Sequence, residues 1–142
     1  MPNPNSIPTG EARLLSRSLN LLVVDPHPIT RAATVREIAH LTRQGSARGA
    51  ETAAKALSSL ALIPPDLIVT EVSLNGPSGL DFIRQVTGIA RSAVVLVFSG
   101  APEVWYADRA IRAGARGYVM KSAPPSVLLK AVEKVMRGGG PR

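Results

Sequence analysis

The fold is decided by residues 66–80, which read DLIVTEVSLNGPSGL. The apolar, β-branched run from Leu67 to Thr70 has the length of a buried strand, and it ends on a carboxylate, Glu71. A loop rich in turn residues follows, and a helical pattern begins after Gly79. Sites in open α/β sheets lie outside the carboxyl ends of the strands, which makes Glu71 a candidate site residue. Taken alone, it is more simply a solvated strand end.

Strand-like and helix-like patterns alternate on both sides of this stretch. Apolar strands are predicted over residues 20–25, 67–70, 93–98 and 116–120, and the spacing requires a further, weak strand near residues 44–50, suited to a sheet edge. Each strand is followed by a helical pattern; these begin near Pro28, Thr52, Leu80, Pro102 and Pro125. The second is predicted to run from Thr52 to Leu62. The apolar faces of the first and third are predicted to hold residues 32, 35, 38 and 39 and residues 82, 83 and 86. Five alternations with buried strands predict an α/β fold, a parallel sheet with helices on both faces.

Composition favours one globular domain that functions inside the cell. The chain has 142 residues, 45% of them hydrophobic, and no cysteine, which excludes disulfides and thiolate metal sites. No apolar run reaches the roughly 18 residues of a membrane span, and the start does not resemble a signal peptide. We therefore expect a cytoplasmic protein with a disordered extension (1–18), one domain (19–137) and a flexible tail (138–142).

The positive charge is concentrated near the C-terminus. The chain carries a net charge of +7, of which +5 falls in residues 101–142. A basic face attracts nucleic acid, acidic protein surfaces or anionic lipid, although a merely solvated surface is the simpler interpretation.

Four short stretches, taken in order, resemble the receiver domain of two-component response regulators. They are residues 23–28 (VVDPHP), 65–71 (PDLIVTE) with 79–81 (GLD), 97–100 (VFSG) and 113–121 (AGARGYVMK), and the last resembles receivers joined to a helix-turn-helix domain. The resemblance covers residues 21–137. It implies a flavodoxin-like, doubly wound five-stranded sheet with strand order 2-1-3-4-5.

In that family a histidine kinase donates a phosphoryl group to an aspartate. Mg²⁺, held by acidic side chains, neutralises the charge, while a lysine and a hydroxyl bind the phosphoryl oxygens. The resemblance places Asp25 at the first acid of the pocket, Ser99 at the switch hydroxyl, Lys121 at the lysine and Tyr118 at the switch aromatic.

Two pocket positions depart from the family pattern. In the loop after Glu71, Asn75 also stands where the family commonly has a proline. Pro26 stands at a metal-ligand position and has no carboxylate, and Glu71 stands at the phosphoacceptor position. Losing one carboxylate weakens an Mg²⁺ site, and the extra methylene of glutamate moves the nucleophilic oxygen by roughly 1 Å, which can cost about 100-fold in rate. We expect a pseudo-receiver without aspartyl phosphorylation, with no catalytic residue, no cofactor and weak or absent Mg²⁺ binding.

The retained groups leave two interpretations of Glu71 open. Lys121 is expected to pair with its carboxylate and Ser99 to donate a hydrogen bond to it, since a buried charge needs such partners. The cluster then either partly imitates a phosphoryl group or is a structural ion pair. Tyr118 is likewise either a rotating switch or a fixed, half-buried aromatic.

An interaction surface is predicted on the last two helices. Val104, Ala107 and Ile111 are expected to form the inner stripe of the helix after Pro102, leaving Trp105 on a face with Asp108, Arg109 and Arg112; an aromatic among arginines is typical of an interface hot spot. On the last helix, Leu129 and Met136 lie off the inner stripe formed by residues 128, 131, 132 and 135.

We therefore expect a stand-alone atypical receiver that acts in signal transduction through a protein partner or an own-chain dimer. Contact with a histidine kinase is compatible with this function and not required by it, and nucleic acid and membrane are not expected partners. The alternatives are a phosphorylation-competent receiver of a phosphorelay, a nucleic-acid-binding module using the basic C-terminal third, and an unrelated flavodoxin-like enzyme, for which no cofactor loop is found. No metal-ligand constellation accompanies His27 or His40.

Overall fold

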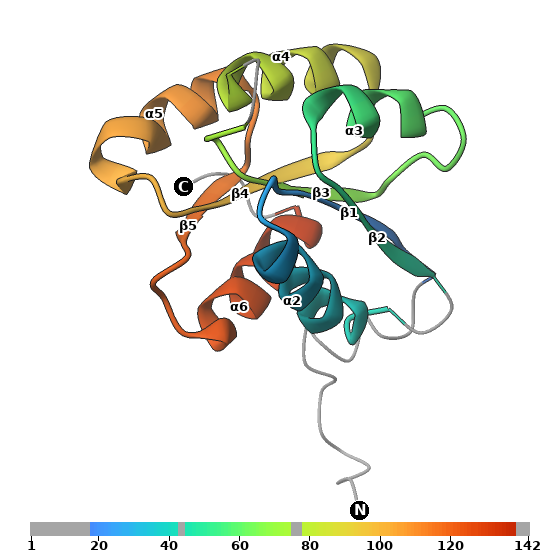
Figure 1. Ribbon diagram of the computed structural model, residues 1–142, viewed down its shortest axis with the longest axis horizontal. Coiled ribbons are helices and arrows are strands. Elements are labelled where there is room, and N and C mark those ends of the chain that lie inside the picture. The colour runs from blue at the N-terminus through green and yellow to red at the C-terminus, as the bar shows by residue number, and fades with distance from the viewer. Residues whose placement is uncertain (1–17, 43–44, 75–77, 139–142) are drawn as a thin grey trace, which may run out of the picture.

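The computed structural model describes residues 18–42, 45–74 and 78–138 (Figure 1). Residues 1–17 and 139–142, which make up most of the predicted extension and tail, and Asn75 lie outside the described residues. In the part of the chain that is described, no helix is long and apolar enough to cross a membrane.

Five parallel strands form one sheet in the order β2-β1-β3-β4-β5, as the sequence analysis predicted. Their bounds are β1 Asn20–Val24, β2 Ser46–Ala50, β3 Leu67–Thr70, β4 Val94–Ser99 and β5 Gly117–Met120. The central strand β3 is buried along its whole length, and the weak strand β2 lies at the edge of the sheet. Small, poorly apolar residues are tolerated there because an edge strand has a neighbour on one side only.

Helices cover both faces of the sheet. Their bounds are α2 Pro28–Ala39, α3 Ala53–Ser59, α4 Gly79–Ile89, α5 Glu103–Ala113 and α6 Pro125–Met136. Figure 1 shows α3, α4 and α5 on one face and α2 with α6 on the other. This doubly wound arrangement follows from parallel pairing, since each crossover returns over one face of the sheet.

The sheet separates two hydrophobic cores. Successive strand residues point to opposite faces, so Leu22, Val24 and Ile68 pack with Phe82 and Val86 under α3, α4 and α5. Their neighbours face the other layer, where the second core is formed mainly by Leu21, Val23, Ile38, Leu41, Leu67, Val69, Leu96, Leu128 and Val132. Because both faces are covered, the strands are apolar along their length rather than alternating in polarity.

Local sequence signals set several helix ends. Pro28 lies in the first turn of α2, and the side chains of Thr52 and Ser78 accept the N-cap bonds of α3 and α4. Gly114 ends α5 with φ +126°, a conformation that favours glycine.

Three helix predictions need correction. The helix predicted from Thr52 to Leu62 ends at Ser59. On α2 the buried residues are Thr34 and Ile38 rather than Ala32, which is exposed. On α5 the predicted stripe is wrong, because Val104 is 86% exposed and the buried residues are Ala110 and Ala113. In the first turn of α5, Val104 and Trp105 face outward, while Tyr106 packs against the core.

Candidate functional site

Four polar side chains converge where the parallel strands end. Asp25 follows β1, Glu71 follows β3, Ser99 ends β4 and Lys121 follows β5. Backbone hydrogen bonds hold these ends level: Glu71 N–H donates to Val24 C=O (2.9 Å) and Lys121 N–H to Ser99 C=O (2.8 Å). Because the carboxyl ends of parallel strands share one edge, residues far apart in sequence form a single pocket there. Asp25, Glu71 and Ser99 are buried.

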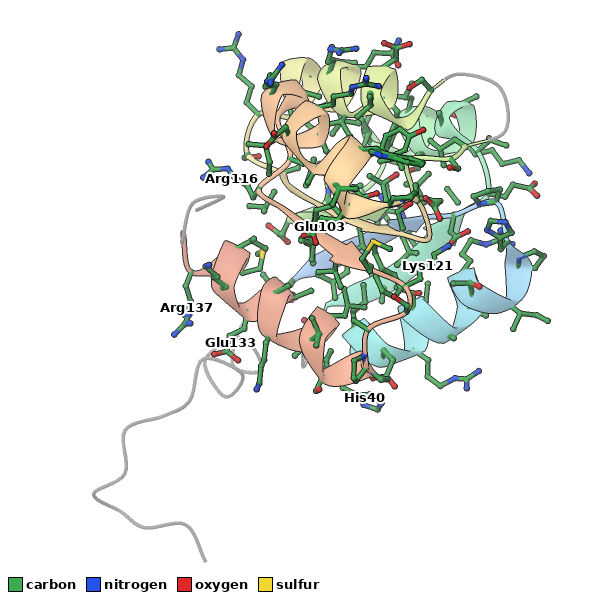
Figure 2. The ribbon with its side chains drawn as sticks, turned by 90° about the vertical axis from the view of Figure 1, so that its left-hand side faces the viewer. His40, Glu103, Arg116, Lys121, Glu133 and Arg137 are labelled. Atoms are coloured by element: carbon green, nitrogen blue, oxygen red, sulfur yellow. The ribbon has the colours of Figure 1, made fainter. Side chains whose placement is uncertain are left out.

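Lys121 bridges the two buried carboxylates. Its Nζ lies 2.7 Å from Asp25 Oδ2 and 2.9 Å from Glu71 Oε1, with 17% of the lysine side chain exposed and 3% of each carboxylate partner. Figure 2 shows Lys121 between the helices above and below the sheet. The ammonium group therefore lies between the two acids, and it pairs with both.

Five donors contact the carboxylate of Glu71. Oε2 accepts from the N–H groups of Val72 (2.8 Å) and Ser73 (3.1 Å) and from the Ser99 hydroxyl, with which it makes a short contact. Oε1 accepts from Gly100 N–H (3.2 Å) and Lys121 Nζ. A carboxylate offers about four lone-pair positions, so the hydrogen-bonding capacity of Glu71 is filled from within the chain.

Burial and hydrogen bonding act on these charges in opposite directions. Burial raises the pKa of the Glu71 carboxyl, but hydrogen bonds from Ser99, Lys121 and Ser73 outweigh it and leave the pKa below its ordinary value. Burial likewise lowers the pKa of Lys121, while bonds to Asp25 and Glu71 outweigh it and leave that pKa raised. Both groups therefore carry their charges at neutral pH.

His27 and Arg31 belong to the pocket and were not assigned to it from the sequence. Asp25 Oδ1 accepts the backbone N–H of His27 and lies 2.9 Å from His27 Nδ1, and Arg31 Nη1 donates to the Asp25 carbonyl (2.8 Å). The spacing of Asp25 and His27, an aspartate two residues before an N–H, is the available signal for this turn. His40 caps the C-terminal end of α2, apart from Lys121 (Figure 2).

Metal-ligand chemistry is sparse in the pocket. Pro26 contributes no side-chain oxygen next to Asp25. Among the residues that the structure describes, no three histidine, aspartate or glutamate side chains gather in a group that could hold a metal ion.

A short hydrogen-bond relay leads from the pocket to β5. Ser99 Oγ, which contacts Glu71, also accepts the N–H of Ala101 (3.0 Å), and the Tyr118 hydroxyl donates to the Ala101 carbonyl (2.7 Å). Tyr118 is partly buried, and burial raises the pKa of its phenol. Glu71, Ser99 and Tyr118 are thus connected through one loop residue.

The predicted interaction residues do not all lie on the surface. Trp105 is 68% exposed, and Arg109 and Arg112 are exposed on the same helix. Leu129 and Met136 instead pack, partly buried, against the core beneath α2 and α6. The predicted interaction residues that are exposed therefore all lie on α5, and with Val104 they form a surface that we name the α5 face (Val104, Trp105, Arg109 and Arg112).

Comparison with known proteins gives consistent relatives. The chain is 32% identical over 124 residues to the transcriptional activator protein ExaE of Pseudomonas putida, and 27% identical over 119 residues to the fimbriae Z protein of Salmonella typhimurium. These matches cover 84% of this chain and 56% and 57% of those proteins, so it spans just over half of their length.

Solved structures agree with the sequence relatives. A LuxR-family two-component response regulator from Aurantimonas sp. SI85-9A1 superposes with a TM-score of 0.80 at 30% identity, covering 87% of this chain and 89% of that one. The isolated receiver (REC) domain of RcsB from Salmonella enterica has a TM-score of 0.79 at 17% identity, covering 87% and 92%, and supports the fold alone. The response regulator receiver domain model matches residues 21–133. The chain therefore belongs to the response regulator receiver domain family, whose members serve in two-component signalling.

Proposed function

We propose that this receiver signals through protein–protein contact and does not use aspartyl phosphorylation. The observation that carries the proposal is the filled carboxylate of Glu71, which accepts from five donors of its own chain. A nucleophilic oxygen needs a free lone pair aimed at the incoming phosphorus, and these contacts leave none unengaged.

The residue at the metal-ligand position supports the same proposal. Mg²⁺ favours six oxygens in a nearly ideal octahedron, and the side chain of Pro26 supplies none. The Lys121 ammonium lies at 2.7 Å and 2.9 Å from the two carboxylates that would otherwise face the ion. We therefore propose that Lys121 is the resident counter-ion of this pocket, and that its residues do not fit a divalent metal.

The relay to Tyr118 favours partial mimicry of a phosphoryl group over a purely structural ion pair. Glu71 engages a hydroxyl, a lysine and a backbone N–H, which are the kinds of donor that bind phosphoryl oxygens. Through Ser99 and Ala101 the carboxylate is linked to the ring of Tyr118. In this proposal the pocket holds the loop before α5 in one state, and the α5 face contacts the partner.

Acetyl phosphate and Mg²⁺ test the missing phosphotransfer. After incubation, intact mass spectrometry is expected to show the wild-type chain unmodified. The Pro26→Asp/Glu71→Asp variant restores both acids and serves as the matched positive control, which is expected to gain one phosphoryl mass. A wild-type chain that gains this mass contradicts the proposal, whatever the variant does.

The ring resonances of Tyr118 test mimicry. Glu71→Gln removes the charge but keeps the size of the side chain, so the Ser99 contact weakens and the Tyr118 signals are expected to shift or broaden. Thr70→Ser, a conservative change at a buried neighbour whose hydroxyl donates to the Glu71 carbonyl and is kept by serine, is the control. Tyr118 signals that match those of the wild type in Glu71→Gln would mean that the ion pair is only structural.

Trp105→Ala tests the contact surface. A 68% exposed tryptophan makes little contribution to the stability of the free chain, so unfolding is expected to change by less than about 0.5 kcal/mol while association weakens. Sedimentation equilibrium measures an own-chain dimer, with Ile89→Ala, an exposed aliphatic residue of α4, as control. A wild-type chain that remains monomeric excludes the dimer and leaves a different protein as the partner.

A further inference from the structure

We propose that the outer edge of β2, which pairs with no other strand among the described residues, binds an extended, acidic segment of a partner protein that adds to the sheet as a further strand. This surface lies on the opposite side of the sheet from β5 and does not include the α5 face. The proposal is independent of whether Glu71 is ever phosphorylated.

The hydrogen-bond register shows which backbone groups face outward. Ser46 N–H donates to Leu19 C=O and Asp25 N–H donates to Ala50 C=O, both at 3.0 Å, at the two ends of the β1–β2 pairing. In a parallel ladder the bonded residues alternate, so Ser46, Arg48 and Ala50 direct their peptide groups toward β1. The N–H and C=O groups of Ala47 and Gly49 therefore point away from the sheet, as an added strand requires.

Side chains leave this edge open. Ala47 and Gly49, whose peptide groups point outward, are the two smallest residue types, and Gly49 is exposed. A groove of about 270 Å³ runs beside it, lined by Leu22, Arg31, Arg48, Gly49, Lys55 and Ser59 among others. A proline is one device by which edge strands avoid pairing, and the strand from Ser46 to Ala50 contains none.

Basic side chains flank the edge on both faces of the sheet. Arg31 of α2 lies over Gly49, since a Cβ built on that glycine would lie 2.9 Å from Arg31 Cγ. On the α3 face, Arg48 Nη2 donates to Ile63 C=O (2.7 Å), and its buried Nη1 has no acceptor among the described residues. Lys55 lines the same groove.

Glu51 is the one acidic side chain among the groove residues, and it pairs with Lys55. The groove therefore keeps an excess of positive charge on both sides of the outward peptide groups. Side chains of an added strand alternate between the two faces, so carboxylates on either face meet an arginine or lysine.

Charge also argues against a second copy of this chain as the occupant. Two β2 strands paired edge to edge would bring Arg48 and its symmetry mate together, and like charges opposed across a strand pair are destabilising. An acidic segment meets the same groups with opposite sign, and electrostatic complementarity speeds its encounter.

Hydrogen exchange of single amides, read by NMR, distinguishes strand addition from loose charge attraction. The probe is a capped hexapeptide of alternating glutamate and valine, compared with its lysine and valine counterpart. Without peptide, we expect fast exchange at Ala47 and Gly49 and slow exchange at Ser46, Arg48 and Ala50. With the acidic peptide, exchange at Ala47 and Gly49 is expected to slow by about tenfold or more, while the other amides are unchanged.

Two variants and one matched control complete the test. Ala47→Pro removes an outward N–H without touching the ladder to β1 and is expected to abolish the protection at Gly49. Lys55→Gln is expected to weaken binding several-fold, whereas Arg84→Gln, at a similarly exposed ion-paired residue of α4, leaves it unchanged. Equal effects of the acidic and basic peptides, or chemical shifts without slower exchange at both amides, would overturn the proposal.

Discussion

At the scale of single residues, the stability of the site depends on the contacts that compensate the buried charges of Glu71 and Lys121. Their charged atoms lie 2.9 Å apart where only 17% of the lysine and 3% of the glutamate are exposed. Removing two charges from water costs several kcal/mol each, and attraction offsets this only when further hydrogen bonds complete both groups. Here the backbone of Val72, Ser73 and Gly100 and the second carboxylate, Asp25, provide those bonds.

Glu71→Gln is expected to destabilise the fold by about 3 kcal/mol, because it leaves a buried ammonium with one carboxylate instead of two. Urea unfolding measures the change. Glu37→Gln, on the partly exposed side of α2, is the control and is expected to stay within about 0.5 kcal/mol of wild type. A Glu71→Gln protein as stable as wild type would show that the pair contributes nothing net.

The same pair predicts the pH dependence of stability. The pKa of Glu71 is lowered on folding, so its contribution is present above the ordinary value of 4.5 and is lost as pH falls through the folded pKa. The pKa of Lys121 is raised, so its contribution is complete below 10.5 and is lost as pH rises through the folded pKa. The urea concentration at the unfolding midpoint should therefore fall at both low and high pH. In Glu71→Gln, its fall at low pH should be smaller. A variant whose fall at low pH matches that of wild type would assign acid unfolding to other carboxylates.

At the scale of elements, the ends of the helices determine where the strands begin. Gly114 turns the chain at the end of α5 with φ +126°, and the N–H of Ala115 then bonds back to Ala110 C=O at 2.9 Å. The turn leads directly to Arg116, whose N–H donates to Val95 C=O, so that β5 starts in register with β4. A single glycine thus places the strand that carries Tyr118 and precedes Lys121.

Gly114→Ala is expected to destabilise the fold by about 1–3 kcal/mol, since the backbone is left-handed and the new Cβ would lie 2.4 Å from Thr87 Cγ2. Gly88→Ala provides the opposite case: it lies inside α4 with nothing within 4 Å, and alanine there is expected to stabilise by about 0.5–1 kcal/mol. Thermal unfolding of the pair measures both. Equal shifts of the same sign would mean that Gly114 is not required for its conformation.

At the scale of the whole molecule, the pocket, the α5 face and the β2 edge are three surfaces of one domain, and Arg31 contributes to both the pocket and the groove beside β2. The pocket lies at the carboxyl end of the strands, while β2 and β5 are the two edges. A ligand that binds only the folded chain raises its stability by mass action. If the pocket had oxygen atoms available to bind added ions, those ions would therefore raise the melting temperature.

Mg²⁺ with beryllofluoride, which imitates an aspartyl phosphate, is therefore expected to leave the melting temperature of the wild-type chain unchanged. Pro26→Asp/Glu71→Asp, which regains both acids, is expected to gain about 2.7 kcal/mol when the ligand reaches a hundred times its dissociation constant. Scanning calorimetry with and without the ions makes the comparison. A comparable rise in the wild type would show that the Glu71 donors exchange readily for external ligands.

The sequence by itself determined the layers and most of the site. Apolar runs such as Leu67 to Thr70 can be stable only when covered on both faces, and the carboxylate at the end of this run made Glu71 a candidate. The resemblance to the receiver family then assigned Asp25, Ser99 and Lys121 to the same pocket. Helix faces such as Phe82, Ile83 and Val86 were predicted for the same reason, because their periodicity has one apolar side.

The bonds from Lys121 and Ser99 to Glu71 were expected from the sequence and are present, but only the tertiary structure decided the remaining contacts. Periodicity alone does not reveal which side of a helix meets the rest of the fold, and on α5 Val104 was predicted to be buried and is exposed, while Ala110 and Ala113 are buried. Nor does spacing reveal that Lys121 reaches both carboxylates, that two backbone N–H groups after Glu71 turn back onto its own side chain, or that Arg31 and Arg48 flank Gly49 from opposite faces. These contacts depend on side-chain direction and on the distance between strands, which exist only once the sheet and its two helix layers have packed together.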